Sequence, residues 1–315
     1  MQISIVVPLF NEDESLPELV SWIKRVCLEN KLSFEILLVD DGSTDNSWQV
    51  VNKLSTETQE VRGVKFQQNY GKSAALHVGF QKAKGDVVIT MDADLQDSPD
   101  EIPGLYEMIN EEGFDVVSGW KKKRYDPISK TIPSKFYNWT ARKVTRIPLH
   151  DFNCGLKAYR NKVIKSIEVY GEMHRYIPVI ANRAGFKKIG EKVVQHQERK
   201  YGVTKFGLER FINGFLDLMT ISFISRFGKR PMHMFGTLGT LMFLVGFLSA
   251  VWLGAQKLFL LHKGVKTILI ADSPYFYLAL AAMIIGSQLF VSGFIGELIA
   301  RSSTERNQYF IDEEI

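Results

Sequence analysis

The chain has 315 residues, of which 45% are hydrophobic and 23% are charged, and its formal net charge is +4. This composition is typical of a globular protein, and so mild a charge gives no indication of nucleic-acid binding. The two cysteines, Cys27 and Cys154, exclude a disulfide framework or a cysteine metal cluster and favour a reducing compartment. The N-terminal MQISIVVPLF has no basic region or cleavage site, so we interpret it as a first strand, not a signal peptide.

Strands and helices are predicted to alternate along the first half of the chain. Short runs rich in β-branched residues predict strands at 3–7, 34–39, 61–66 and 87–91, with another beginning at Val116. Helical spacing of apolar residues follows each of the first four runs, and Ser15 to Glu18 has the pattern of a capping box. We therefore expect an α/β fold of the Rossmann-like kind with a mostly parallel sheet.

Polar clusters follow the predicted strands. They are Asn11-Glu12, Asp40-Asp41-Gly42-Ser43, Asn69-Tyr70-Gly71-Lys72 and Asp92-Ala93-Asp94. Because ligands of such sheets bind outside the carboxyl ends of the strands, the four clusters predict a single site at that edge.

Two segments near the C-terminus, 232–255 and 273–295, contain no Asp, Glu, Lys or Arg. Each is long enough to cross a hydrocarbon core of roughly 30 Å as a helix, whereas buried core helices are the alternative interpretation. The short loop at 256–272 predicts a helical hairpin with both chain ends on one side. Without a signal peptide, we expect the N-terminal domain to face the cytosol, at the cytoplasmic (inner) membrane.

The segment at 205–227, which precedes the first apolar segment, mixes aromatic and basic residues. This pattern favours an amphipathic helix in the membrane interface over a core helix of the first domain. We thus predict a catalytic domain at 1–203, juxtamembrane helices at 204–230, a transmembrane hairpin at 231–300 and a cytoplasmic tail at 301–315. Gly236, Gly239, Gly246, Gly286 and Gly293 permit close helix packing, so a homo-oligomer is a further expectation.

Asp92 and Asp94 form the pattern with the clearest chemical meaning. Two carboxylates one residue apart at a strand end point the same way and suit Mg²⁺ or Mn²⁺, which prefers carboxylates, waters and substrate phosphates. Such a metal neutralises the charge of a diphosphate as it leaves. Taken alone, an Asp-x-Asp pattern has little specificity.

A family resemblance supplies the missing context. IVVPLFNEDESL, ILLVDDGSTDNS, NYGKSAAL and MDADLQDSPDEIP resemble, in order and spacing, the family-2 glycosyltransferases of GT-A fold. DFNCGLKAYR, HQERKYGVTKFG and the two terminal spans resemble a narrower group, the polyprenyl-phosphate glycosyltransferases of the bactoprenol glucosyltransferase and dolichol-phosphate mannose synthase type.

The resemblance implies a role for each matching residue. In the nucleotide-sugar site these are Pro8, Phe10, Glu12, Val39, Asp40, Asp41, Asp92, Ala93 and Gln96, and in the metal site Asp92 and Asp94. Lys72 is expected to contact a phosphate, although a solvated lysine in a first helical turn is an equal alternative.

The acceptor side of the site is expected to combine one carboxylate with several cations. Asp151 matches a family motif that lies near the place where sugar and acceptor meet. Its role there is open: it could act as a base, orient the sugar or the acceptor, or anchor the loop. The residues expected to be catalytic are Asp94, Asp151 and Arg124. The residues expected to bind the lipid phosphate are Lys121, Arg124, Arg199 and Lys205. Solvated basic residues are the alternative for the run at 121–124.

The resemblance implies inverting transfer of a hexose, with glucose from UDP-glucose as first choice, to undecaprenyl phosphate. GDP-mannose, UDP-N-acetylglucosamine and modified arabinose donors stay open, as does a non-lipid acceptor. A flippase and a downstream periplasmic transferase are further expected partners. A processive polysaccharide synthase is disfavoured, because Arg199 is followed by Lys200 and Tyr201 and no Gln-x-x-Arg-Trp motif is formed.

Overall fold

The computed structural model describes residues 1–122, 138–169, 171, 173–198, 200–201, 223, 227, 231–266 and 269–302. The chain divides into two compact units, Met1–Ser222 and Phe223–Ile315. The predicted juxtamembrane segment at 204–230, apart from Phe223 and Phe227, lies outside the described residues, as does the tail from residue 303.

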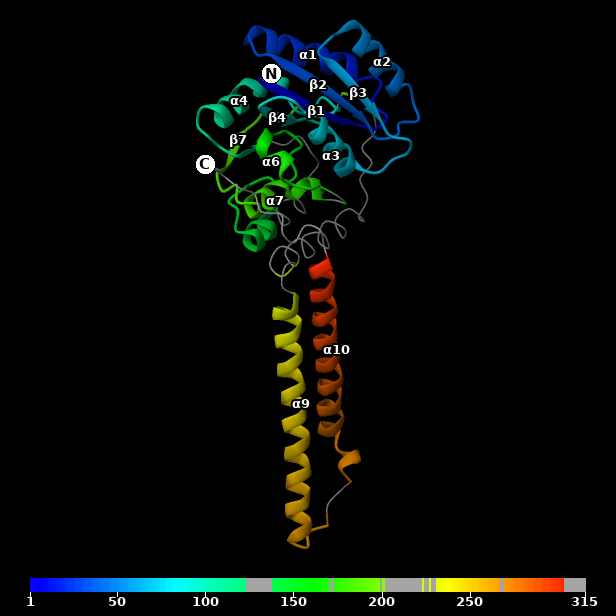
Figure 1. Ribbon diagram of the computed structural model, residues 1–315, viewed down its shortest axis with the longest axis vertical. Coiled ribbons are helices and arrows are strands. Elements are labelled where there is room, and N and C mark those ends of the chain that lie inside the picture. Colours follow the sequence, from blue (N-terminus) through cyan, green and yellow to red (C-terminus); the bar gives the residue numbers. More distant parts are fainter. Residues whose placement is uncertain are drawn as a thin grey trace. The chain divides into compact units, whose positions relative to one another are not determined.

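The first unit is built on a mixed sheet that is mostly parallel. Its strands are β1 (Ile3–Leu9), β2 (Phe34–Asp40), β3 (Val61–Lys65), β4 (Val87–Thr90), β5 (Val116–Trp120), β6 (Lys157–Arg160) and β7 (Ile189–Val193). They lie in the order β3-β2-β1-β4-β6-β5-β7 (Figure 1). Within the described residues, β6 alone runs antiparallel to its neighbours, β4 and β5.

Helices cover both faces of this sheet. α1 (Leu16–Glu29), α2 (Ser47–Glu57) and α4 (Ile102–Asn110) pack on one face, and α3 (Lys72–Lys82), α6 (Asn161–Lys165) and α7 (Ile177–Arg183) on the other. Two short 3-10 helices, η1 (Pro99–Glu101) and η2 (Met173–Tyr176), precede α4 and α7. Alternate strand residues enter opposite cores: Ile36 and Leu38 face α1, whereas Leu37 and Val39 face α3.

The predicted α/β fold with a mostly parallel sheet is confirmed, and the first four strands begin where the sequence placed them. The capping-box prediction is wrong. Ser15 has helical backbone angles and caps no helical amide with its side chain, because its hydroxyl donates to the Glu12 carbonyl instead. Glu18 is paired with Lys200.

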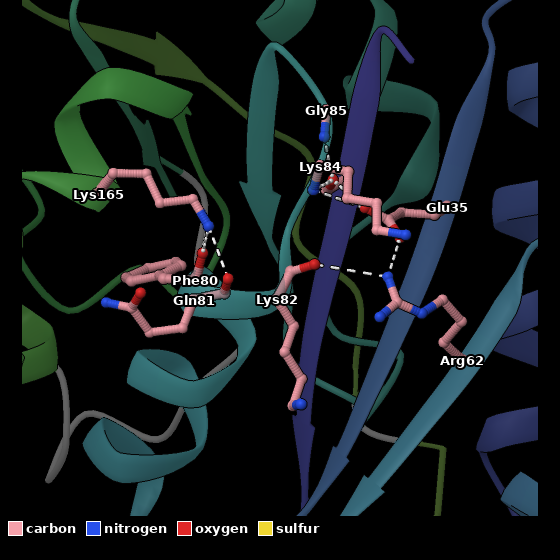
Figure 2. A network of polar contacts seen from close by, with 9 residues as sticks. Glu35, Arg62, Phe80, Gln81, Lys82, Lys84, Gly85 and Lys165 are labelled. Carbon is pink, nitrogen blue, oxygen red and sulfur yellow. Dashed lines mark hydrogen bonds and ion pairs between the residues drawn. The ribbon is translucent and has the colours of Figure 1, made fainter.

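A buried carboxylate, Glu35, joins the amino-terminal ends of β1, β2 and β3 to the segment that follows α3 (Figure 2). It accepts hydrogen bonds from Ser4 Oγ at 2.7 Å, the Lys84 amide at 2.8 Å and Arg62 Nη1 at 2.6 Å. Burial alone would raise the pKa of Glu35, but these three donors outweigh it and lower that pKa. Lys165 donates to the carbonyls of Phe80 and Gln81 near the end of α3, at 2.7 Å each, and so attaches the end of α6 to α3.

The second unit is a hairpin of two long apolar helices, α9 (Pro231–His262) and α10 (Pro274–Ser302), which pack side by side (Figure 1). At 1.5 Å per residue they are about 48 Å and 44 Å long, so each could span a membrane.

Glycines bring the two helix backbones into contact. A Cβ on Gly239 would lie 2.6 Å from the Gly286 carbonyl oxygen, and one on Gly246 would lie 2.5 Å from that of Ala279. These glycines make contacts between α9 and α10 of the same chain, so they no longer support a homo-oligomer. The homo-oligomer stays a prediction.

We expect Glu35→Gln to lower the free energy of unfolding by about 2 kcal/mol, because Arg62 loses its charged partner in a buried position. Differential scanning calorimetry of the full chain in detergent should show a melting temperature lower by about 6 °C. Because the folded-state pKa of Glu35 is lowered, the ionised group stabilises the fold above its unfolded-state pKa of about 4.3. The difference between wild type and variant should therefore hold from pH 8 to about 5 and shrink as pH falls further.

The matched control is Glu57→Gln, which removes an exposed ion pair with Lys53 on α2 and should change the melting temperature by no more than about 1 °C. Equal effects of the two substitutions would contradict the role given to Glu35.

Candidate active site

The candidate site lies at the edge of the sheet where β1, β2 and β4 end. These strands are parallel neighbours, so their carboxyl ends deliver residues 10–12, 40–43 and 91–94 to one place. The antiparallel strand β6 begins at the same edge, because Lys157 pairs with Thr90. The loop 151–155, which precedes β6, therefore reaches the site from the far half of the chain.

Two loops of the candidate site, at residues 40–43 and 69–71, are tied together by short hydrogen bonds. Asp40 Oδ1 accepts the Ser43 amide at 2.8 Å, and Asp41 accepts the amides of Tyr70 at 2.7 Å and Gly71 at 2.9 Å. Burial raises the pKa of Asp41, aided by the charge of Asp40 and opposed by the two amides. Gly42 has φ +73°, and a Cβ there would lie 2.4 Å from the Gln68 carbonyl carbon, so this turn requires glycine.

Several predicted nucleotide-site residues lie here but offer backbone more than side chain. Pro8 pairs with Val39 across β1 and β2, and the Val39 side chain is fully buried in the core against α3. Ala93 is buried in the opposite core. Phe10 follows the end of β1, and the Glu12 amide donates to Ser47 Oγ at 2.9 Å. The roles of these residues toward a nucleotide stay predictions.

Asp92 is the centre of the site's charges. Lys72, at the start of α3, forms an ion pair with its carboxylate, and both side chains are 32% exposed. Burial opposes ionisation of Asp92, but the charge and hydrogen bond of Lys72, together with Lys121 and Lys157, outweigh it and hold the pKa of Asp92 well below its usual range. Asp92 is thus kept as a carboxylate, the form that a metal or a lysine binds.

The Asp92 carboxylate lies directly over Gly155. A Cβ on Gly155 would lie 2.5 Å from Asp92 Oδ2, so no larger residue fits without moving the carboxylate. Thr90 Oγ1 donates to the Gly155 carbonyl at 2.8 Å and holds this loop against the end of β4. The position of Asp92 therefore depends on a glycine more than 60 residues away in the chain.

Asp94 and Gln96 form the next turn of the same loop. The Gln96 amide donates to Asp94 Oδ1 at 3.2 Å, and the Gln96 carbonyl accepts the Gln197 amide at 2.9 Å. His196 Nδ1 lies 3.2 Å from that carbonyl, and residue 196 forms an isolated bridge with Asp97. The segment that leads toward Arg199 is thereby attached to the Asp92–Asp97 loop.

Lys121, predicted to bind a lipid phosphate, instead pairs with the fully buried Asp97, with 2.7 Å between Nζ and Oδ1. Burial would lower the pKa of Lys121, but the charge of Asp97 dominates and raises it. This contact favours a role in holding the loop, and phosphate binding by Lys121 stays a prediction. Arg124, Arg199 and Lys205, the other predicted phosphate ligands, lie outside the described residues.

Asp151 is only 1% exposed and organises its own loop. Its Oδ1 accepts the Asn153 amide at 3.0 Å, and its own amide donates to Glu191 Oε1 at 3.0 Å. Among the roles open to it, these contacts favour a loop anchor or an orienting group over a base, and its catalytic role stays a prediction.

Three residues near Asp92 were not predicted from the sequence. Lys157 is 3% exposed and donates to the carbonyls of Phe152, at 3.3 Å, and Cys154. Burial lowers the pKa of Lys157. Ser73 Oγ lies 3.1 Å from His174 Nδ1 and accepts the His174 amide at 3.1 Å. Lys157 in GLKAYR and His174 in EMHRYIP belong to no motif of characteristic spacing, so the sequence alone does not mark them as site residues. Only the fold brings them near Asp92.

The oxygen ligands at this edge fit a magnesium or manganese ion. Asp92 and Asp94 offer carboxylates and no sulfur or imidazole, and Gly155 leaves room for the Asp92 carboxylate itself. Within the described residues, no group of three or more His, Cys, Asp or Glu side chains is placed to hold a metal alone. This suits an ion that takes its remaining ligands from water and substrate phosphates.

Sequence and structure comparisons define the class. The profile of glycosyl transferase family 2 matches residues 4–168, and the chain belongs to this family. It is therefore a glycosyltransferase, with the GT-A fold of its neighbours among solved structures.

Relatives cover nearly the whole chain. It is 35% identical to the dodecaprenyl-phosphate galacturonate synthase of Rhizobium johnstonii, over 96% of this chain and 88% of that protein. It is 34% identical to the undecaprenyl-phosphate 4-deoxy-4-formamido-L-arabinose transferase of Aeromonas hydrophila, over 99% and 93%. Glucosyl-3-phosphoglycerate synthase of Mycobacterium tuberculosis shares the fold, with a TM-score of 0.53 at 19% identity, over 71% of this chain and 79% of that one.

We predict that Gly155→Ala reduces the turnover number about 100-fold, because the new Cβ displaces the Asp92 carboxylate. Initial-rate measurements on the full chain would show this. Gly254→Ala, at a helical position where a Cβ meets nothing within 4 Å, is the control and should leave turnover unchanged. Wild-type turnover in a folded Gly155→Ala variant would mean that the position of Asp92 is not critical.

Proposed function

We propose that this glycosyltransferase moves a sugar from a nucleotide diphosphate-sugar to polyprenyl phosphate at a membrane surface. The observation that carries the proposal is the extent of the similarity. Relatives named for dodecaprenyl and undecaprenyl phosphate match 96% and 99% of the chain, so the match includes both apolar helices. A hairpin of two helices long enough to span a membrane is consistent with a lipid acceptor.

The donor binds at the carboxyl edge of the sheet. The turns at Pro8–Glu12 and Val39–Asp41 hold its nucleotide, and Asp92 and Asp94 hold Mg²⁺ or Mn²⁺. When bound, that ion supplies positive charge to the diphosphate. Manganese is named with UDP-glucose in a solved glucosyl-3-phosphoglycerate synthase of similar fold, but at 18% identity that likeness concerns the fold and does not choose between the two ions.

The transfer needs no general base. A phosphate monoester is anionic near neutral pH, because its second pKa is about 6. Its oxygen forms the new bond to the anomeric carbon, the bond from that carbon to the diphosphate oxygen breaks, and the nucleoside diphosphate leaves with the electron pair. Asp151, held by the Asn153 amide, orients this region in place of removing a proton.

Arg124, Arg199 and Lys205 receive the acceptor phosphate in this proposal. Two of them follow segments attached to the site: Arg124 comes after β5, and Arg199 after the stretch that is bonded to Gln96. The catalytic unit would face the cytosol. A flippase and a second transferase on the other side of the membrane would use the product.

The sugar is the least constrained part of the proposal. Glucose from UDP-glucose stays a prediction, whereas the names of the relatives favour galacturonate or a formamido-arabinose, and modified arabinose was among the open alternatives. A non-lipid acceptor is the second candidate for the reaction. The solved structures of similar fold that act on such acceptors give it little weight, because their likeness at 19% identity or below concerns the fold alone.

The acceptor is tested with the purified full chain in detergent, undecaprenyl phosphate, Mg²⁺ or Mn²⁺, and a panel of radiolabelled UDP- and GDP-sugars. We expect label from one donor in the organic phase and its loss with EDTA. Label that stays in the aqueous phase on another product would favour the non-lipid acceptor.

Asp94→Asn should reduce metal-dependent transfer by at least about 1000-fold, because an amide is a poor ligand for Mg²⁺ or Mn²⁺ and the leaving diphosphate loses its counter-charge. Initial rates at saturating metal would measure it, with Asp100→Asn as a control on an exposed carboxylate near α1. Undiminished turnover of the Asp94 variant would remove its metal role.

A single displacement predicts inversion at the anomeric carbon, so an α-linked donor should give a β-linked lipid product. Anomeric coupling constants in the NMR spectrum of the product would report it. A retained α-linkage would require a double displacement or a front-face reaction, and would contradict a single backside displacement by the phosphate.

A further inference from the structure

Three lysines place positive charge around Asp92, but two of them are held in fixed positions. Lys157 is almost fully buried and donates to two backbone carbonyls, and Lys121 is paired with the buried Asp97. Lys72 differs, because its side chain is about one third exposed and its ammonium rests on the Asp92 carboxylate itself. Lys72 is therefore paired with the carboxylate that would have to bind the metal in the proposed reaction.

The backbone on both sides of Lys72 is fastened. On one side, Asp41 accepts the amides of Tyr70 and Gly71. On the other side, Ser73 Oγ is joined to both the amide and the ring of His174. The first turn of α3 is therefore fixed, and the flexible four-carbon stem of Lys72 is the part that is able to move.

We propose that Lys72 is the resident counter-cation of Asp92, and that metal and diphosphate together displace its ammonium from this carboxylate onto the diphosphate. This inference rests on the proposed function, since it assumes that a nucleotide diphosphate and a divalent cation meet at Asp92.

The exchange follows from the charges at the site. An ammonium and a divalent cation repel each other, so a metal alone has to compete with Lys72 for Asp92. A diphosphate brings negative charge of its own and offers the ammonium a new partner. The metal should thus bind weakly without a nucleotide and strongly with one, and the lysine would then pair with the diphosphate, whose negative charge increases as it leaves the sugar.

The test measures Mn²⁺ binding to the full chain in detergent, without nucleotide, from the electron paramagnetic resonance signal of free Mn²⁺. We expect Lys72→Met to lower the Kd for Mn²⁺ at least fivefold, because the competing ammonium is gone. Lys72→Arg keeps a cation and should keep the weak binding of the wild type. Adding Asp92→Asn to Lys72→Met should abolish the gain.

Lys82→Met, at an exposed position near the end of the same helix, is the matched control and should leave the Kd unchanged. If Lys72→Met does not fold, as judged by its melting temperature, Lys72→Gln replaces it. A folded variant that binds Mn²⁺ no more tightly than wild type overturns the inference, and so does a gain that persists after Asp92→Asn.

The transfer assay with the lipid acceptor distinguishes failure of the Lys72 inference from failure of the proposed function. Lipid labelling by the wild type, combined with no gain in Mn²⁺ affinity for Lys72→Met, overturns the role of Lys72 alone. A gain that Asp92→Asn abolishes supports the exchange even if the lipid acceptor proves wrong.

Discussion

The contact between the Asp92 carboxylate and the bare Cα of Gly155 is the constraint on which the rest of the site depends. It exists because β6 runs antiparallel between β4 and β5, so that the loop before β6 meets the loop after β4. The same arrangement carries Asp151 and Lys157 to the edge where β1 and β2 deliver the nucleotide turns. One reversed strand thus joins the donor half of the chain to the half that leads to the apolar helices.

The charges around this contact are arranged before any substrate arrives. Two lysines are immobilised, by carbonyls in the case of Lys157 and by Asp97 in the case of Lys121. Fixed cations stabilise developing negative charge without the cost of reorganisation, which is the usual source of electrostatic catalysis. Lys72 is the third cation, and its side chain is able to move. In the proposed reaction a diphosphate lies beside a phosphate monoester, and such a site would need both kinds of cation because its negative charge changes as the reaction proceeds.

The sequence predicted much of the fold and the strand ends at which the candidate site lies, because these signals are local. A β-branched run followed by an acidic turn marks the carboxyl end of a strand, and Asp41 and Asp92 both lie where that pattern placed them. β7 was missed, since its five residues, IGEKV, lack both alternation and an acidic turn. Lys157, Ser73 and His174 could not be predicted, because each acquires its role from a partner far away in the chain. Lys157 pairs with Thr90 across 67 positions, and Ser73 contacts His174 across 101 positions. Lys121 was interpreted as a solvated or phosphate-binding cation because its partner, Asp97, belongs to another strand end.

The apolar hairpin bears on the acceptor more than on the fold of the catalytic unit. Gly239 and Gly246 let α9 approach α10 at backbone distance, so the hairpin is a closely packed pair in its own right. Such a pair gains little from hydrophobic association inside a lipid bilayer and depends on close packing instead, which explains why its contacts are made by glycines. The proposed lipid acceptor is consistent with this hairpin, because relatives named for polyprenyl phosphates are similar to this chain over the same helices.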